Sequence, residues 1–314
     1  MNVTIHDLAR LAGLNSSTIS RALRNDPRVR QSTRDKIHAL AEKYGYTPNL
    51  NARNLADGKT RMIAFLMGSL DFQLGREAAV TLNDIFSQYG YTLMIFSYAP
   101  DPERFYADRL EKLTQKICDG AILTAPDYTI QSDRILSLLK AVKIPLICLD
   151  RWFPNHPLPV VTTDNTIAIP RLCQRALEAG MDGAVIDFPA TDTVSESRRE
   201  ETVKFLEAKR IPFIFPEEGC NISGFLRRNR IHKAAVFANN CLLEQPWTEL
   251  LPPDFIAVGF DTEHAPEQHS GAVFRCIQDY RTVADTAARL LLKQLDDSAA
   301  IPETPVLVPP AAIV

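Results

Sequence analysis

The sequence has little of what marks membrane, secreted or zinc-binding proteins. No stretch approaches the roughly 20 apolar residues that cross a bilayer, and the first ten residues lack the apolar core of a signal peptide. The six cysteines form no CxxC pair and lie near no histidine cluster, which argues against a zinc site and a disulfide framework. We therefore expect a cytoplasmic protein with no membrane contact and with reduced, mostly buried thiols.

Enzyme signatures are missing as well. The chain contains no GxSxG, no P-loop, no HExxH and no GxGxxG. His264 and His269 lie in a predicted loop near Asp261, but a pair of loop histidines is more often solvated than catalytic. We therefore expect a protein that is not an enzyme and that uses no cofactor and no metal.

Charge is divided unevenly along the chain. The 314 residues include 35 Lys and Arg against 38 Asp and Glu, a net charge of −3. Residues 1–61 carry 11 of the basic and 5 of the acidic residues, whereas the other 253 carry 24 basic and 33 acidic residues. A basic head on an acidic body indicates that only the head meets a polyanion. The length allows two or three folded units.

Three short helices are predicted in the head. Thr4 is a capping residue for the first helix, whose apolar residues follow a helical period. A second helix is predicted from Ser16 to about Leu23, and Ser32 is the predicted cap of a third, which Gly45 ends. Two helices joined by a turn of a few residues form a helix-turn-helix.

From Arg61 onward, short apolar strands alternate with amphipathic helices. One series runs from MIAFLM to PLICLD, and a second runs from VVTTD through GAVIDF and DFIAVGFD to a last helix from Tyr280 to about Leu295. This alternation is typical of an α/β fold with parallel sheets. Two such series imply two lobes with a cleft between them.

The second helix of the head is the expected reading helix. If it lies in the major groove, its outward residues should be polar and able to reach base edges or phosphates. Ser17 and Arg21 share one face, and arginine can make a bidentate contact to guanine. The predicted DNA-contacting residues here, with Thr18 and Asn25 at phosphates, are Ser16, Ser17, Thr18, Ser20, Arg21, Arg24 and Asn25. A solvated helix face carries the same residue types, so that alternative stays open for each of them.

The head also resembles a known family. The string VTIHDLARLAGLNSSTISRALRNDPRV, followed by YGYTPNLNARNLADGKTRMIAFL, resembles the N-terminus of the LacI/GalR family of bacterial transcription regulators. Over residues 1–66 the helix-turn-helix, third helix, Y-x-P turn, hinge helix and first core strand of that family follow one another without gaps. The resemblance implies that Ser16, Ser17 and Arg21 occupy the main base-reading positions.

The same resemblance implies a hinge helix over Asn51 to Ala56. Leu55 stands where a leucine wedges into the minor groove at the operator centre, and Arg53 is placed along the groove or against phosphate. An apolar wedge costs roughly a few kcal/mol of unstacking per base step and bends the DNA toward more protein contact.

The expected organisation has three parts. It places a helix-turn-helix DNA-binding domain at residues 1–50 and a hinge helix with a linker at 51–60. A two-lobed domain for effector binding and dimerisation follows at 61–314.

Residues 67–295 resemble the family more loosely, and the implied fold is that of periplasmic sugar-binding proteins. Ligands of such folds lie between the lobes at the carboxyl ends of parallel strands. Arg198 falls on the arginine that clamps the effector in the family. The residues that follow predicted strands, and are therefore expected at the cleft, are Ser69, Asp71, Phe72, Asp150, Asn239 and Asp261, with Arg151 and Trp152 next to Asp150. Paired donors and acceptors of this kind suit the vicinal hydroxyls of a sugar.

Several positions of the second lobe depart from the family pattern. The glycine-histidine at its start reads Gly180-Met181, the glycine after the clamp arginine reads Glu201, and a Pro-Leu-Thr-Thr segment is replaced by SGAVFRC. Strand-end aspartates also cap helices and loops in any α/β protein. A second hypothesis therefore stays open, in which the body is a dimerisation or protein-interaction module and the cleft is vestigial.

These patterns together predict a sequence-specific DNA-binding transcription regulator, with repression implied by the resemblance. We expect a homodimer on a pseudo-palindromic operator of double-stranded DNA. A small-molecule effector, a sugar or sugar derivative, would act from the cleft by its differential affinity for two lobe arrangements.

Overall fold

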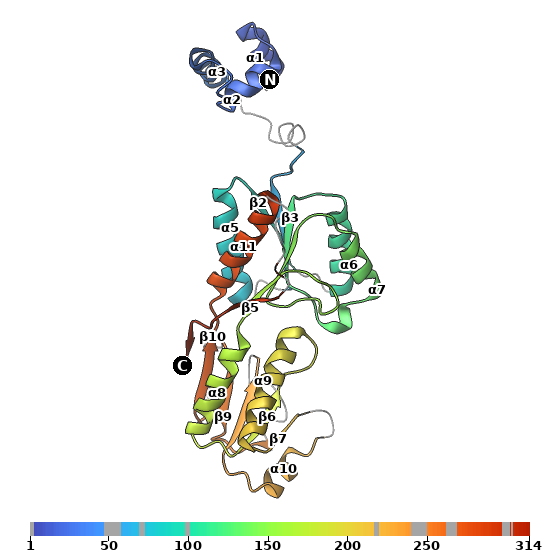
Figure 1. Cartoon of the computed structure of the whole chain (residues 1–314), viewed down its shortest axis with the longest axis vertical. Helices are drawn as coiled ribbons and strands as arrows, with labels where there is room; N and C mark the ends of the chain where they lie inside the picture. The colour runs from blue at the N-terminus through green and yellow to red at the C-terminus, as the bar shows by residue number, and fades with distance from the viewer. Residues whose placement is uncertain are drawn as a thin grey trace. The chain divides into compact units, whose positions relative to one another are not determined.

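The structure is a computed structural model that describes residues 3–46, 58–68, 73–97, 101–216, 220–239, 250–261, 269–296, 302 and 304–314. The chain divides into two compact units, Met1–Thr60 and Arg61–Val314 (Figure 1). Among the described residues, no helix has both the length and the apolar character that crossing a membrane requires.

The first unit contains three helices, which are α1 (Ile5–Ala12), α2 (Ser16–Leu23) and α3 (Gln31–Lys43). The predicted cap of α1 is confirmed, because Thr4 Oγ1 accepts from Asp7 N at 3.3 Å and the Asp7 carboxylate accepts from Thr4 N at 3.0 Å. Ser32 lies inside α3, so the prediction that it caps this helix was wrong. Arg30 holds the cap position, without a side-chain cap.

The core of the first unit lies where the three helices meet. Leu8 of α1, Ile19 and Ala22 of α2, and Ile37 of α3 are at most 1% exposed. The Arg34 guanidinium donates to the carbonyl oxygen of Val29 at 3.0 Å and thereby ties α3 to the turn that precedes it. Since one face of α2 is committed to this core, its opposite face is left for other contacts.

The first lobe of the second unit is built on a six-stranded parallel sheet in the order β11-β5-β4-β3-β1-β2. Its strands are β1 (Met62–Leu66), β2 (Thr92–Phe96), β3 (Gly120–Leu123), β4 (Leu146–Leu149), β5 (Val160–Thr163) and β11 (Val306–Val308). Its helices are α5 (Gln73–Gln88), α6 (Pro102–Thr114), α7 (Asp133–Ala141) and α11 (Tyr280–Asp296), with a 3₁₀ turn η1 at Tyr128–Ile130.

Both faces of this sheet are covered by helices. Ile63 and Phe65 of β1 pack toward α5 and α11, whereas Ala64 and Leu66 pack toward α6 and α7. This alternation is the two-residue period of a strand buried on both sides. Figure 1 shows α5 and α11 side by side on one face, with α6 and α7 on the other.

The second lobe has a sheet in the order β12-β10-β9-β8-β6-β7, parallel except for the pairing of β12 with β10. Its strands are β6 (Gly183–Asp187), β7 (Phe213–Ile214), β8 (Ala234–Ala238), β9 (Ile256–Phe260), β10 (Val273–Ile277) and β12 (Ala312–Ile313). Its helices are α8 (Asn165–Glu178), α9 (Thr193–Lys209) and α10 (Ile222–Arg228). The predicted two-lobed fold with parallel sheets is therefore confirmed.

The chain crosses between the lobes more than once, and this corrects the assignment of elements to lobes. VVTTD opens the second series in the sequence, yet β5 pairs with β4 and β11 in the first sheet. The last helix, α11, likewise packs on α5 in the first lobe. Helix α10 and strands β10, β11 and β12 were not predicted. Local periodicity reports how a segment is buried and does not report which sheet buries it.

Candidate functional site

The outer face of α2 carries the residues predicted to contact DNA. Ser17 and Arg21 are exposed on α2 and Arg24 and Asn25 directly after it, whereas Ser16, Thr18 and Ser20 are half-buried. The backbone of Asn25 is left-handed, with φ 57°, and its Oδ1 lies 3.1 Å from His38 Nε2 of α3. The amide nitrogen of Asn25 is then the part of the side chain that can donate to a phosphate.

The turn after α2 has its own ion pair. Asp26 and Arg28 form a charge-assisted pair with Nη2 to Oδ2 at 2.7 Å. The hydrogen bonds from Arg28 hold the pKa of the Asp26 carboxyl far below its ordinary value. Arg28 is thus bound within the head, while Arg21 stands on the exposed face of the predicted reading helix.

Five of the predicted contact residues lie outside the described residues. Arg53 and Leu55 belong to the expected hinge, and Ser69, Asp71 and Phe72 follow β1. They remain sequence predictions.

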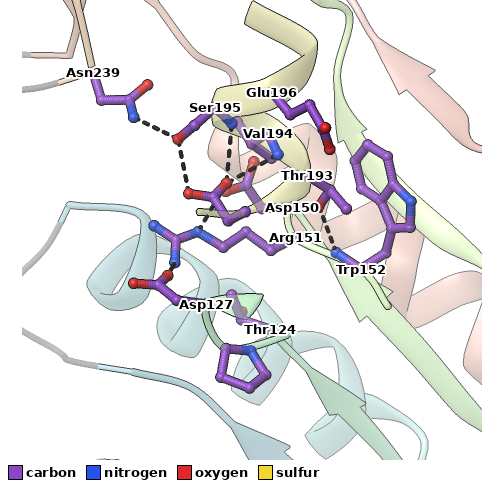
Figure 2. Close-up of polar contacts among 12 residues, drawn as sticks. Thr124, Asp127, Asp150, Arg151, Trp152, Thr193, Val194, Ser195, Glu196 and Asn239 are labelled. Atoms are coloured by element: carbon purple, nitrogen blue, oxygen red, sulfur yellow. Dashed lines mark hydrogen bonds and ion pairs between the residues drawn. The ribbon is translucent and has the colours of Figure 1, made fainter. Parts of the chain in front are cut away.

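The other four predicted effector residues come together where the two lobes meet. Asp150 follows β4 of the first lobe, whereas Arg198 on α9, Asn239 after β8 and Asp261 after β9 belong to the second lobe. We use the name inter-lobe cluster for these residues and their polar neighbours, which are Asp127, Asp150, Arg151, Asp192, Ser195, Arg198, Asn239, Asp261, Gln278 and Tyr280. Figure 2 shows several of them around the first turn of α9.

Arg198 is the buried cation of this cluster, with a residue exposure of 5%. Its Nη1 donates to Asn239 Oδ1 at 2.8 Å and its Nη2 donates to Gln278 Oε1 at 3.1 Å. The guanidinium carbon lies 3.4 Å from the centre of the Phe260 ring. Its Nε is buried and has no hydrogen-bond partner among the described residues. Arg198 is therefore fixed from three sides, and these two hydrogen bonds use two of the five N–H donors of its guanidinium.

Asp261 is bonded to Gln278 and Tyr280. Its Oδ1 accepts from Gln278 N at 2.8 Å, and its Oδ2 accepts short hydrogen bonds from Gln278 Nε2 and Tyr280 OH. Burial, and then the charge of Asp261, raises the pKa of Tyr280 well above its ordinary value, so the phenol stays a donor. Asp261 thus has most of its acceptor capacity satisfied inside the protein.

Asp150 has a different environment. Its carboxylate accepts one hydrogen bond among the described residues, from Thr162 Oγ1 at 3.4 Å, and its backbone is left-handed with φ 64°. Burial raises the pKa of this carboxyl, while Arg198 and Arg151 oppose that shift. A poorly satisfied carboxylate on a strained residue at a parallel-strand end is typical of a ligand site.

Polar contacts join the lobes at the start of α9. Arg151 of the first lobe lies with Nη1 2.5 Å from Asp127 Oδ1, and its Nε lies 3.5 Å from Asp192 Oδ1 of the second lobe. Asp192 also caps α9 by accepting from Val194 N at 2.9 Å and Ser195 N at 3.0 Å. Trp152, which was expected at the cleft, donates its backbone N–H to Thr193 of the second lobe at 3.1 Å. The contacts at Arg151 and Trp152 therefore depend on the lobe arrangement.

A further lobe contact pairs Tyr128 OH with Glu196 Oε2 at 2.6 Å. Neither residue was predicted, nor were Asp127, Asp192 and Gln278. Asp127 comes shortly after β3, so the expectation that residues after parallel strands lie at the cleft applies to it as well. Asp192 has the residue type of a helix cap and precedes α9. Tyr128 and Glu196 carry no local signal of this kind, because their partners are far away in the sequence, whereas Gln278 directly follows β10, a strand that was not predicted. In the described part of the chain, no group of three or more His, Cys, Asp or Glu side chains is placed to hold a metal ion.

Comparison with known proteins identifies the head first. Residues 4–49 match the family model described as bacterial regulatory proteins, lacI family. The chain is 24% identical over 312 residues to the transcriptional repressor PurR of Actinobacillus pleuropneumoniae, with 93% of this chain and 91% of that protein covered. The head, residues 4–49, therefore belongs to the lacI family of bacterial regulatory proteins.

Other similarities of this chain differ in their coverage. It is 28% identical to catabolite control protein A of Priestia megaterium over 180 residues, 57% of this chain and about half (53%) of that protein. A lac repressor dimer bound to operator and the anti-inducer ONPF has a TM-score of 0.76 at 19% identity, with 100% and 98% of the two chains covered. That likeness shows the shared fold of head and two-lobed domain.

The departures from the family pattern have structural consequences in this member. Met181 replaces the expected histidine and is 3% exposed, packed in the core between the second sheet and α8. Glu201 replaces a glycine on α9 and pairs with Lys204 at 3.5 Å. Both residues make their contacts within the second lobe. The four predicted effector residues remain together at the lobe boundary, and they are Asp150, Arg198, Asn239 and Asp261.

Proposed function

We propose that this LacI-family chain represses transcription by binding as a homodimer to a pseudo-palindromic operator through α2. The observation that carries the proposal is the division of α2 into two faces. Ile19 and Ala22 are fully buried, whereas Ser17 and Arg21 are exposed on the opposite side. These residues lie within the segment that matches the family model. In a helix-turn-helix, the exposed face of the second helix enters the major groove.

The residues of this surface have separate roles in the proposal. Arg21 is long enough to make a bidentate contact to guanine, and the shorter serines donate to base edges or phosphates. The net charge of +6 over residues 1–61 attracts the phosphate backbone without regard to sequence. Arg53 and Leu55 are proposed to enter the minor groove from a hinge within residues 51–60. Two copies would then match two half-sites related by a two-fold axis.

The second unit, 61–314, is proposed to dimerise and to bind a small-molecule effector between its lobes. Support comes from the inter-lobe cluster, which gathers donors and acceptors from both lobes at strand ends. An effector that prefers one arrangement of the lobes shifts operator occupancy by that preference. A sugar or sugar derivative fits the mixture of Asp, Asn and Arg groups. The proposal includes no catalytic step.

Selection of DNA ligands from random sequence by the full-length protein tests the operator proposal. We expect the selected pool to contain two half-sites in inverted orientation, bound by a dimer in analytical ultracentrifugation. Recovery of DNA without a palindrome would refute binding by a two-fold dimer, and failure to enrich any sequence would refute specific recognition.

The vestigial-cleft hypothesis is favoured by one specific observation. Both Nη atoms of Arg198 and the carboxylate of Asp261 are already bonded inside the protein. Thermal unfolding with added sugars, sugar phosphates and nucleosides separates the hypotheses, because a ligand that binds the folded state raises the midpoint. No shift with any compound would support a purely dimerising body.

A further inference from the structure

The turn that follows α2 is held in place by α3. This turn spans residues 25–29. Arg34 of α3 donates from Nη1 to the carbonyl oxygens of Asp26 and Val29, both at 3.0 Å. Asp26 is also paired with Arg28 inside the same turn. The backbone of the turn is therefore fixed by contacts within the head, directly after the helix whose exposed face is proposed to enter the major groove.

His38 of α3 reaches the first residue of this turn. It lies four residues after Arg34, so the two side chains share one face of the helix. Its Nε2 atom lies 3.1 Å from Asn25 Oδ1. Because an amide oxygen only accepts, Nε2 carries the proton and donates to it. Helix α3 thus contacts both the backbone of the turn and the side chain of its first residue.

This contact selects one orientation of the Asn25 amide. Asn25 is exposed, and its backbone is left-handed, a conformation that asparagine tolerates better than most residues. With Oδ1 engaged by His38, the group that remains to donate is Nδ2, which carries two N–H donors. Phosphate oxygens only accept, so the reversed amide would meet a phosphate acceptor to acceptor. The orientation that His38 favours is the one that suits a phosphate.

His38 contributes little to the core of the head. Its side chain is exposed, whereas α3 contributes Ile37 at 1% exposure and Ala41 at 8% exposure to that core. Replacing an exposed polar residue of this kind usually changes folding stability very little. The contact between His38 and Asn25 is therefore expected to matter for what Asn25 binds, and much less for folding.

We propose that His38 is a positioning residue of the operator interface, which holds the Asn25 amide so that Nδ2 donates to a phosphate of the operator backbone. The inference rests on the proposed function, because it concerns the same DNA-binding surface. One hydrogen bond of this kind favours one of two amide orientations by about fivefold. Since phosphate contacts carry no base information, His38 sets the affinity and leaves base preference to α2.

A double-mutant cycle on the full-length protein measures the positioning. Binding of the selected operator is followed by fluorescence anisotropy for the parent, His38→Ala, Asn25→Gly and the double variant. Glycine is used because it accepts the left-handed backbone at this position. We expect each single variant to bind about fivefold more weakly, and the double variant to bind no more weakly than Asn25→Gly, because His38 acts through Asn25. Losses that multiply to about 25-fold in the double variant would overturn the inference.

His38→Gln is the conservative variant, because its side-chain amide can donate to Asn25 Oδ1 as the imidazole does. We expect it to recover most of the affinity that His38→Ala loses. His232→Ala removes an exposed histidine of the second unit and should leave operator affinity unchanged. Failure of glutamine to restore binding would overturn the inference. So would a His38→Ala head that unfolds at a clearly lower temperature in circular dichroism, since the loss would then reflect folding.

Operators with a single methylphosphonate linkage identify the phosphate itself. This linkage removes the charge of one phosphate and leaves the bases unchanged. We expect one position in each half-site at which it weakens the parent about fivefold but weakens His38→Ala and Asn25→Gly less than about twofold. A purely structural role of His38 would not abolish the response to one particular phosphate. Equal sensitivity of all three proteins at every position would overturn the inference.

Failure of the proposed function gives a different result. If selection from random DNA yields no preferred sequence, specific operator binding is refuted, and this inference with it. If an operator is selected and His38→Ala binds it as tightly as the parent, the inference alone is refuted.

Discussion

Replacing Arg198 by methionine removes the central cation of the inter-lobe cluster while keeping an unbranched side chain in its place. The variant loses the bonds to Asn239 at 2.8 Å and Gln278 at 3.1 Å, together with the stacking on Phe260. Because Gln278 is 7% exposed, its freed Oε1 has little access to water. The partners of Arg198 therefore become unsatisfied polar groups in the folded state.

The expected loss follows from these contacts. Each charge-assisted hydrogen bond is worth about 1.5–3 kcal/mol, and a desolvated cation–π contact adds about 2 kcal/mol. The apolar methionine recovers about 1.5–3 kcal/mol by its own burial, and the protein no longer buries the Nε donor. We expect Arg198→Met to lower the free energy of unfolding of the second unit by about 3 kcal/mol, in line with breaking a buried ionic network.

Urea unfolding followed by tryptophan fluorescence measures this change, because both tryptophans, Trp152 and Trp247, belong to the second unit. At a slope of about 3 kcal/mol per molar urea, the midpoint should fall by about 1 M. Arg199→Met is the matched control on the same helix. Arg199 also stacks on an aromatic ring, Phe215, at 3.6 Å, but it is half-buried, so we expect a loss of about 0.5–1 kcal/mol.

Equal midpoints for the two variants would refute the reasoning. So would a stabilised Arg198→Met, because some buried ionic groups are replaced by apolar residues without loss. In that case, desolvation of the guanidinium would outweigh its hydrogen bonds in the absence of ligand.

Three further predictions concern a carboxyl group, a helix cap and the thiols. Burial raises the pKa of the Asp150 carboxyl in the folded protein above its ordinary value of 3.8, so the free energy of unfolding falls as the pH rises from 3.8 through the raised pKa. Asp150→Asn lacks this ionisation and should therefore be more stable than the parent at pH 7, with the difference in stability closing toward pH 3. Equal stability of the two proteins at pH 7 would contradict this prediction. Thr4→Ala should lower the stability of the head by about 1 kcal/mol in thermal unfolding followed by circular dichroism, and an unchanged midpoint would argue against the cap. Burial raises the pKa of four thiols to about 12, so they should react with a disulfide reagent at pH 8 only after unfolding, and rapid native labelling would contradict their burial. They are Cys118, Cys148, Cys173 and Cys276.

The helices of the head and the strand-helix alternation of the body were predictable because their signals are local. The cap at Thr4, the apolar spacing of α2 and the apolar strands each depend on residues within one element. Helix α9 begins at Thr193 because Asp192 accepts from the N–H groups of the first turn, and this cap is also a local signal.

The lobe assignment and part of the inter-lobe cluster could not be predicted in this way. Strand β5 and helix α11 are placed by pairing partners that lie far away in the sequence. Gln278 directly follows β10 and joins the cluster because β10 ends beside β9, but β10 itself was not predicted. Asp150, Asn239 and Asp261 were named because parallel strands deliver their carboxyl ends to one edge, and Arg198 was named from the family resemblance. The residues after predicted strands therefore included Arg151 and Trp152, which contact the second lobe, but not their partners Asp192 and Thr193.

The central claim is that α2 reads base sequence through Arg21. Binding of the selected operator, and of operators with single base changes, is measured by fluorescence anisotropy for the parent, Arg21→Ala and Lys36→Ala. Lys36 is an exposed cation on α3, so its removal controls for charge. We expect Arg21→Ala to lose about 1–3 kcal/mol and its preference at one base pair of each half-site, whereas Lys36→Ala weakens all sequences alike. Full base preference retained by Arg21→Ala would contradict the claim.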